Sequence, residues 1–424
     1  MHRAQTLLLS LSLLSSHALA QDRTSESGEA AISDPVVECS PYSYAPVTNA
    51  LAQFPTVWSL ATALLPSDTE GQTLFKSINS SIPPFPPQGT SLGDFSAFTP
   101  GYNVSDPDCW WTFHQCVTPK WPGLPPDIAN VPEPKTLGYG FDDGPNCSHN
   151  AFYDYLTQQN QKASTCFVLM QTLHHGLMPA AAMFYIGSNV MNHPLEAQRA
   201  VADGHQICVH TWSHHYMTSF TNEGAFAELW YALKAIKLVT GVTPLCWRPP
   251  FGDVDDRIRF IAKALNLTTI IWQRDSFDWE NGQNGITNTT VQGNYDSLIS
   301  DVQNGKYDTA GAIMLTHELN NYTMQIAVDN YPALSKAFSH IVPIAVAMNE
   351  SNPYAEKNIT FQTFQQYISN QSASASASPS GSAGSGTGSA GAAQATGGKS
   401  DAVVTRVPVS VALLVALFAA AALI

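Results

Sequence analysis

Short apolar runs alternate with longer amphipathic stretches between Lys135 and about Ala347. The short runs predict buried strands, and a longer helical periodicity predicts a helix over 222–240 with Asn222 as its N-cap and Gly241 as its stop. Because strands and helices alternate, we expect a parallel α/β domain, either an open sheet or a closed barrel. Catalytic side chains in such domains gather where the strands end. The predicted strands are 137–141, 182–186, 206–209, 268–273 and 311–315.

The segments on either side of this main domain, 135–347, lack sustained periodicity. Residues 21–134 are rich in proline, serine and aromatic residues, and they predict an irregular N-terminal extension. Cys109 and Cys116 lie close together in it and predict a small disulfide-stapled lead-in. A structured wrap around the main domain explains this composition better than an independent binding module does. Residues 348–371 form a C-terminal extension.

Both ends of the chain carry the composition of targeting segments. Residues 1–20 combine a weakly basic start, an apolar run and a small-residue cleavage site, which predicts a signal peptide. Residues 372–399 are a tether of serine, alanine and glycine, and residues 400–424 predict a GPI-anchor signal that is removed on maturation. The alternative is a tail-anchored transmembrane helix, but no charged residue follows the apolar tail. We therefore expect a secreted protein held at the cell membrane by a lipid anchor, or at the cell wall.

Composition and cysteine count agree with export. Hydrophobic residues make up 44% of the 424 residues, charged residues only 12%, and the formal net charge is −14. This balance allows a large core and argues against nucleic-acid binding, which requires a basic face. Nine Asn-x-Ser/Thr sites are typical of a secreted chain: Asn79, Asn103, Asn146, Asn266, Asn288, Asn321, Asn349, Asn358 and Asn370. The seven cysteines are Cys39, Cys109, Cys116, Cys147, Cys166, Cys208 and Cys246, an odd number for an oxidising compartment.

Motifs with chemical potential follow the predicted strands. Asp142 and Asp143 precede Gly-Pro at a strand end, where a turn lets both carboxylates reach one pocket. His210 and His214 have the i, i+4 spacing of one helical face and could hold one metal ion together with a carboxylate. Two histidines and one carboxylate also serve iron oxygenases, but the second carboxylate here favours hydrolysis, in which a water needs a base. The remaining motifs are Arg248-Pro-Pro-Phe251-Gly252, Asp275-Ser-Phe-Asp278-Trp279 and Leu315-Thr-His317.

Taken together and in this order, the motifs resemble those of the polysaccharide deacetylase family, carbohydrate esterase family four. The resemblance extends from Phe141 to His317, about two fifths of the chain. The fungal chitin deacetylase branch is matched more closely still, at Gly187-Ser-Asn189, at Asp203-Gly-His205 and over 246–256. Gly140 departs from the family, which usually has threonine there. The resemblance implies a distorted (β/α) barrel with an irregular N-terminal extension, and hydrolysis of N-acetyl groups.

The resemblance also implies a role for each motif residue. Asp143, His210 and His214 would hold Zn²⁺ or another divalent metal such as Co²⁺. Asp142 would be the base, Arg248 would orient it, and the Phe251 N–H would stabilise the oxyanion. His317 would protonate the leaving amine, with its pKa raised by Asp275 or Asp278, and this choice stays open. Leu315 and Trp279 would line the pocket for the acetyl methyl group.

The function expected from this resemblance is hydrolysis of N-acetyl groups in chitin, giving chitosan and acetate. The expected partners are chitin or chitin oligomers and the membrane or wall reached through the anchor, and the protein is expected to be a monomer. The alternatives are an acetyl esterase acting on acetylated xylan or another glycan, and a non-catalytic cell-wall protein on the same fold. The intact acidic and histidine motifs argue against the non-catalytic alternative.

One segment does not fit the family pattern. The family leads from Lys-Ala-Thr directly into an apolar strand that ends in Ile-Gly, whereas here 165–182 separate Ser164 from Met183. This excess of 18 residues is apolar, would interrupt a core strand, and contains the odd cysteine, Cys166. A surface insertion should be polar. We therefore hypothesise that 165–182 translate an unspliced intron of 54 nucleotides, which the mature message should lack. The alternative is a genuine insertion, such as a lid.

Overall fold

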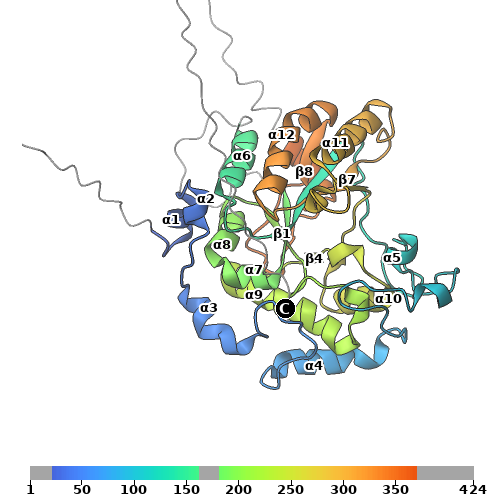
Figure 1. Ribbon diagram of the computed structural model, residues 1–424. Coiled ribbons are helices and arrows are strands. Elements are labelled where there is room, and N and C mark those ends of the chain that lie inside the picture. The colour runs from blue at the N-terminus through green and yellow to red at the C-terminus, as the bar shows by residue number, and fades with distance from the viewer. Residues whose placement is uncertain (1–21, 162–180, 370–424) are drawn as a thin grey trace, which may run out of the picture. The chain divides into compact units, whose positions relative to one another are not determined.

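The computed structural model describes residues 22–161 and 181–369, which belong to one compact unit (Figure 1). An eight-stranded sheet runs in the order β5-β4-β3-β2-β1-β7-β6, and β8 pairs with β1. All the pairings between strands are parallel. The strands are β1 Thr136–Gly144, β2 Ala182–Tyr185, β3 Gln206–Val209, β4 Cys246–Trp247, β5 Thr268–Thr269, β6 Arg274–Asp275, β7 Ala312–Leu315 and β8 His340–Pro343.

The central strand is β1, and every one of its residues is buried. Residues 140–144 pair with β2, whereas its first residues pair with β7 and β8. A strand that is covered on both faces shows no alternation of apolar and polar residues, and residues 137–141 of β1 have this pattern. The N-terminal extension adds backbone bridges from Ile128 to Ile270 and from Val131 to Gly311, next to β5 and β7. The sheet is therefore curled, and the predicted distorted (β/α) barrel is confirmed.

Helices cover the sheet between the strands (Figure 1). In the main domain they are α6 Asn150–Gln161, α7 Gly187–Asn192, α8 Pro194–Ala202, α9 Asn222–Thr240, α10 Asp256–Ala264, α11 Asn288–Gln303, α12 Asn321–Ala337 and α13 Ile344–Ala347. The extension has only short helices, which are α1 Glu26–Ala30, α2 Pro35–Glu38, α3 Ala45–Ala50, α4 Thr69–Ile78 and α5 Trp111–His114. Single 3₁₀ turns are η1 Leu51–Gln53, η2 Asn79–Ser81, η3 Thr99–Gly101, η4 Met217–Ser219, η5 Pro250–Gly252 and η6 Asp278–Glu280.

Two local predictions need correction. Helix α9 has the predicted bounds, but its N-cap is Thr221, whose hydroxyl accepts from the Gly224 N–H at 3.1 Å; Asn222 is the first helical residue. The predicted strand 268–273 ends early, because its backbone changes partner twice. Ile270 N–H donates to Trp247, Ile271 N–H donates to Ile128, and Gln273 N–H donates to Ile313. The chain crosses there from the β4 side of the sheet to β7.

One disulfide, Cys39–Cys147, and several buried charges hold the extension against the domain. The bridges are Cys39–Cys147, Cys109–Cys116 and Cys208–Cys246. The buried Arg259 side chain of α10 bonds Asp127 of the extension at 2.7 Å. Asp256 at the start of α10 accepts from the backbone N–H groups of Lys120 and Trp121. The six described cysteines thus form three disulfides, the number expected when Cys166 is left out of the count.

Several predicted segments lie outside the described residues. These are the signal peptide, the tether, the anchor signal, Cys166 and the hypothetical intron as far as residue 180. Ala182, the last residue assigned to the excess, is the first residue of β2 and pairs with Gly140. Across 22–161 and 181–369, the helices are too short or too polar to span a bilayer.

Candidate active site

The predicted metal ligands Asp143, His210 and His214 meet where β1 and β3 end. Asp143 lies near the end of β1 with a left-handed backbone, φ 71°, and His210 directly follows β3. The histidines do not lie on a helix, so the predicted helical face is wrong. Left-handed residues Thr211 and His214 instead fold 210–214 into a loop that returns the second imidazole to the first. Their ring centroids lie 4.9 Å apart.

The three side chains fit a divalent metal ion. One ligand atom from each lies within 4.8 Å of the other two. The Asp143 Oδ1 atom lies 3.4 Å from His210 Nε2 and 3.1 Å from His214 Nε2, yet it is buried without a hydrogen bond. His210 Nδ1 lies 2.7 Å from the Arg248 carbonyl oxygen, which requires a proton on Nδ1 and leaves Nε2 free as a ligand. A carboxylate and two imidazoles are a donor set suited to zinc.

Asp142 is buried beside this group and is bound to Arg248. Arg248 Nη1 donates to Asp142 Oδ1 at 2.6 Å, and its guanidinium lies over the Phe184 ring at 3.9 Å. Burial lowers the pKa of Arg248, and Asp142 partly offsets this effect. For Asp143, burial would raise the pKa, but His214 and His210 outweigh it and hold the pKa well below its usual range. The two adjacent carboxylates therefore have different partners.

His317 lies opposite Asp142 on the neighbouring strand end. Their backbones form a parallel bridge, in which Asp142 N–H donates to Thr316 and Glu318 N–H donates to Asp142. The alternative left open by the sequence is settled geometrically, since His317 Nδ1 lies 2.6 Å from Asp278 Oδ1. Burial alone would lower the pKa of His317, but Asp278 outweighs burial and raises it to about 9. Asp275 instead accepts from the Phe277 N–H at 2.7 Å.

The remaining predicted residues surround these groups. Phe251 has φ 57° and stacks on Tyr216 with ring centroids 4.1 Å apart; no hydrogen bond from its N–H is found within the described ranges. The Trp279 ring centroid lies 6.5 Å from that of His317. Leu315 is buried at the end of β7, two residues before His317. The fold therefore brings all the predicted site residues to one end of the sheet.

The departure at Gly140 has a steric reason. A Cβ atom at this position would lie 2.8 Å from the Ala182 carbonyl oxygen and 3.2 Å from the Phe184 ring. Phe184 is the residue on which the Arg248 guanidinium stacks. Glycine at 140 thus leaves room for the aromatic ring that supports the Arg248–Asp142 pair.

Two buried glutamates that the sequence analysis missed support the site. Glu318 accepts from the Asn146 N–H at 2.9 Å and the Tyr153 hydroxyl at 2.9 Å, and it lies 2.8 Å from His149 Nδ1. It therefore fixes the loop that follows Asp143. Glu228 of α9 accepts from the N–H groups of Trp212 and Ser213, inside the histidine loop. The signal available for Glu228 was an acidic residue with apolar neighbours on both sides, over 225–233. Glu318 had only its place after His317.

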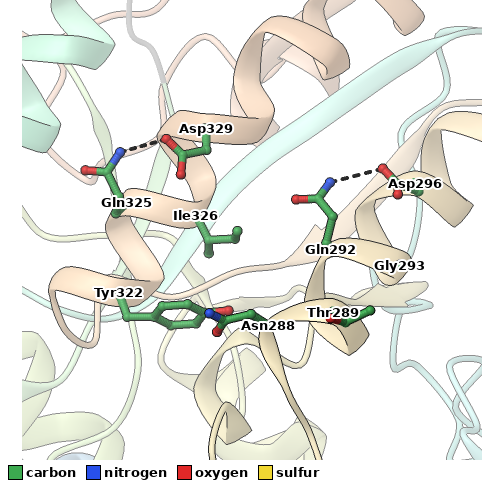
Figure 2. Close-up of a pocket in the computed structure, with 9 residues that line it drawn as sticks. All are labelled: Asn288, Thr289, Gln292, Gly293, Asp296, Tyr322, Gln325, Ile326 and Asp329. Carbon is green, nitrogen blue, oxygen red and sulfur yellow. Dashed lines mark hydrogen bonds between the residues drawn. The ribbon is translucent and has the colours of Figure 1, made fainter. Parts of the chain in front are cut away.

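A groove of about 620 Å³ lies elsewhere, between α11 and α12 (Figure 2). Figure 2 shows the hydrogen-bonded pairs Gln292–Asp296 and Gln325–Asp329 on its sides and Tyr322 beside Asn288. None of the residues that line it is a predicted site residue. The groove is therefore separate from the candidate catalytic group.

Comparison of the chain with known proteins identifies its family. The polysaccharide deacetylase family model matches residues 129–270. The chain is 52% identical over 352 residues to chitin deacetylase 2 of Cryptococcus neoformans var. grubii, covering 82% of this chain and 72% of that protein. It is 43% identical over 329 residues to the chitin deacetylase of Amylomyces rouxii, covering 76% and 73%. The chain belongs to the polysaccharide deacetylase family. A solved chitin deacetylase of Colletotrichum lindemuthianum is 19% identical, with a TM-score of 0.45, covering 55% of this chain and 96% of that one.

Proposed function

We propose that this enzyme hydrolyses the N-acetyl groups of chitin in a metal-dependent reaction, giving chitosan and acetate. The observation that carries the proposal is the arrangement of the two aspartates. Asp143 faces His210 and His214, while Asp142 is held by Arg248 at 2.6 Å beside them. Relatives named chitin deacetylase, 52% and 43% identical over most of the chain, support chitin as the substrate.

The residues present can supply each part of an amide hydrolysis. When bound by Asp143, His210 and His214, a divalent ion such as Zn²⁺ or Co²⁺ would polarise the acetamide carbonyl and make a nearby water more acidic. Asp142 takes one proton from the attacking water as its oxygen bonds to the carbonyl carbon. The Phe251 N–H, which is free of other partners in the described structure, stabilises the resulting oxyanion.

His317 completes the reaction by donating a proton to the amide nitrogen. The C–N bond then breaks, acetate leaves, and the sugar keeps a free amine. Asp278 holds His317 through Nδ1, so the other ring nitrogen, Nε2, is the one available to the leaving group. With its pKa raised to about 9, chiefly by Asp278 against burial, His317 is protonated at neutral pH. The proton taken by Asp142 balances the one that His317 gives.

The test is acetate release from chitin oligomers by the purified protein. Treatment with a chelator should abolish release, and added Zn²⁺ or Co²⁺ should restore it. Asp143→Ala should lose bound metal and activity, whereas Asp142→Asn should keep the metal and lose activity by about 10²–10⁴-fold, the usual contribution of a general base. Acetylated xylan is the substrate control, since preferential release from it would indicate an esterase. Near-full activity of Asp142→Asn would refute the assigned roles.

We further propose that the protein acts outside the cell, at the membrane or wall, attached through a lipid anchor. Three disulfides among the described residues support an oxidising compartment. The cell wall is also where a polymeric GlcNAc substrate is accessible.

A further inference from the structure

Large apolar side chains are exposed on both sides of the candidate catalytic group. On one side Phe277, 37% exposed, stacks with Trp279 beside His317. On the other side Phe251, 36% exposed, contacts the His214 ring at 4.8 Å. Exposed apolar surface of this kind, continuous with a polar site, marks a ligand-binding groove. Next to Phe251, Gly252 packs against Trp111 of the N-terminal extension. Most of this extension lies outside residues 129–270, the part of the chain that matches the family model.

Trp58 of the extension is linked to Asp143 through two neighbouring residues of α7. Its N–H donates to the Ser188 hydroxyl at 2.9 Å, and the next residue, Asn189, donates from Nδ2 to the Asp143 carbonyl oxygen at 2.7 Å. Trp58 is 46% exposed and has φ 66°, a left-handed conformation that a bulky side chain seldom adopts. Such strain persists only where surrounding contacts hold it, and it is concentrated at functional sites.

The backbone around Trp58 is fixed to the histidine loop. Ala61 N–H donates to Glu228 Oε1 at 2.8 Å, and the same carboxylate accepts from Trp212 and Ser213. The Phe54 and Trp212 rings also stack, with centroids 5.8 Å apart. Because one buried glutamate holds both segments, Trp58 keeps a defined position relative to the metal ligands.

A pocket of about 260 Å³ lies next to this segment, between the extension and the start of α9. Tyr216, which stacks on Phe251, donates its N–H to the carbonyl oxygen of Ser91 in the pocket wall at 3.3 Å. Tyr216 therefore links the pocket wall to Phe251, which in turn contacts His214. Its lining combines apolar Leu60 and Phe220 with the hydroxyl side chains of Thr62, Thr90, Ser219 and Thr221.

We propose that residues 56–62 and 89–93 of the extension form a distal subsite for the same polysaccharide chain that is deacetylated. A β-linked amino-sugar polymer presents apolar C–H ring faces and hydroxyl edges in alternation. Trp58 would stack on a ring face, and the pocket would take a neighbouring sugar through its hydroxyl groups. This inference rests on the proposed function, because it assumes that the catalytic group acts on such a chain.

The consequence is that long oligomers are better substrates than short ones. Contacts made far from the reacting bond raise kcat/KM when their binding energy is used in the transition state. The proposal requires that a disaccharide at the catalytic group does not reach the distal subsite and that a hexamer does. The ratio of kcat/KM for the hexamer to kcat/KM for the dimer therefore measures the contribution of the distal subsite to catalysis.

The experiment compares this ratio between the full-length protein and two variants. Trp58→Ala should lower the ratio about tenfold, the order expected from loss of one large apolar contact. Thr62→Arg, which fills the pocket, should lower it similarly. The matched controls are Phe98→Ala and Val104→Arg, at exposed positions of the extension that do not line the pocket, and both should keep the wild-type ratio. Thermal unfolding checks that all four variants fold.

The outcomes separate the two proposals. Normal acetate release with an unchanged ratio in Trp58→Ala and Thr62→Arg overturns the distal subsite and leaves the function intact. No acetate release from any oligomer by the wild-type protein overturns the proposed function itself. In that case, calorimetry compares the affinity of Trp58→Ala for the hexamer with that of the wild-type protein. A tenfold loss of affinity supports binding of the polymer by the extension, and equal affinity rejects it.

Discussion

Gly144 is the residue at which the chain leaves Asp142 and Asp143, and there is no room for a side chain at this point. A Cβ atom there would lie 2.4 Å from Glu318 Oε2 and 2.7 Å from the Tyr185 ring. We expect Gly144→Ala to lower the free energy of unfolding by about 1–3 kcal/mol, the usual effect of overpacking, and to reduce activity by displacing Asp143. Chemical denaturation and acetate release measure the two effects.

The matched control for this substitution is Gly101→Ala. A Cβ atom at Gly101 meets nothing within 4 Å, and its φ lies outside the left-handed region. This control should stay within about 0.5 kcal/mol of wild type. If Gly144→Ala behaved like the control, the loop between β1 and α6 would be more adaptable than its contacts with Glu318 imply.

His205 gives the protein a specific dependence on pH. It is 1% exposed, neither ring nitrogen has a hydrogen-bond partner in the described structure, and burial lowers its pKa to about 3. The unfolded chain takes up a proton at this residue near pH 6.5 and the folded chain does not, so stability is lost as pH falls from 6.5 towards 3. By pH 5 the loss attributable to His205 is about 2 kcal/mol.

The measurement is the free energy of unfolding against pH for wild type and His205→Phe. The variant has no proton to bind, so its curve should be flatter between pH 6.5 and 4. Glu196, whose pKa burial raises to about 7, acts in the opposite direction in both proteins, so the difference between the curves isolates His205. Parallel curves would show that His205 is protonated in the folded protein.

Helix α9 carries Glu228 to the histidine loop, so its N-terminal cap bears on the site. Thr221 provides that cap through its hydroxyl. Thr221→Ala should lower the free energy of unfolding by about 1 kcal/mol, while Thr221→Ser keeps the hydroxyl and should lose much less. Denaturant titration of both variants checks this. Equal losses would mean that the Thr221 methyl group, not the cap, is responsible.

The same helix illustrates what the sequence can and cannot predict. Periodicity located both of its ends, but a cap is chosen by backbone geometry, and threonine and asparagine are both good caps. Of the strands that lie between two neighbours, β1, β2, β3 and β7 were predicted to within a few residues, because each contains a short, mostly apolar run. The two-residue strand β4 was not predicted, because it is too short to show a pattern. The run 268–273 was wrong because its backbone changes partner along its length, and this leaves no trace in the side-chain pattern.

In the candidate site too, some features could be predicted from the sequence and others could not. The predicted motif residues all lie at one end of the sheet, because each motif stands at or just after the end of a strand. The i, i+4 histidines were placed on a helix, but left-handed Thr211 and His214 make a loop, and non-glycine residues with positive φ are not signalled by sequence. The choice of Asp278 over Asp275 needed coordinates, since both carboxylates flank the same turn and only one reaches His317.

At the scale of the whole molecule, the extension is a structural part of the enzyme rather than an appended module. It supplies bridges beside β5 and β7, two cysteines that pair within it and one that pairs with the main domain. The Cys39–Cys147 bridge closes a loop across 108 residues of sequence. Disulfides stabilise by restricting the unfolded chain, and they form in oxidising compartments. This architecture is suited to an exported enzyme.

The anchor proposal is tested on cells that make the full-length chain. If the 400–424 segment is replaced by a glycolipid, a phosphatidylinositol-specific phospholipase should release active protein into the medium, because it cuts the lipid and leaves the polypeptide intact. A chain truncated after Gly398 is the control, and it should be secreted and active without treatment. A transmembrane tail would instead resist the phospholipase, and mass spectrometry of the membrane fraction would find peptides from 407–424. That result would replace the lipid anchor by a tail-anchored helix, while acetate release by the truncated chain would still report on the catalytic group.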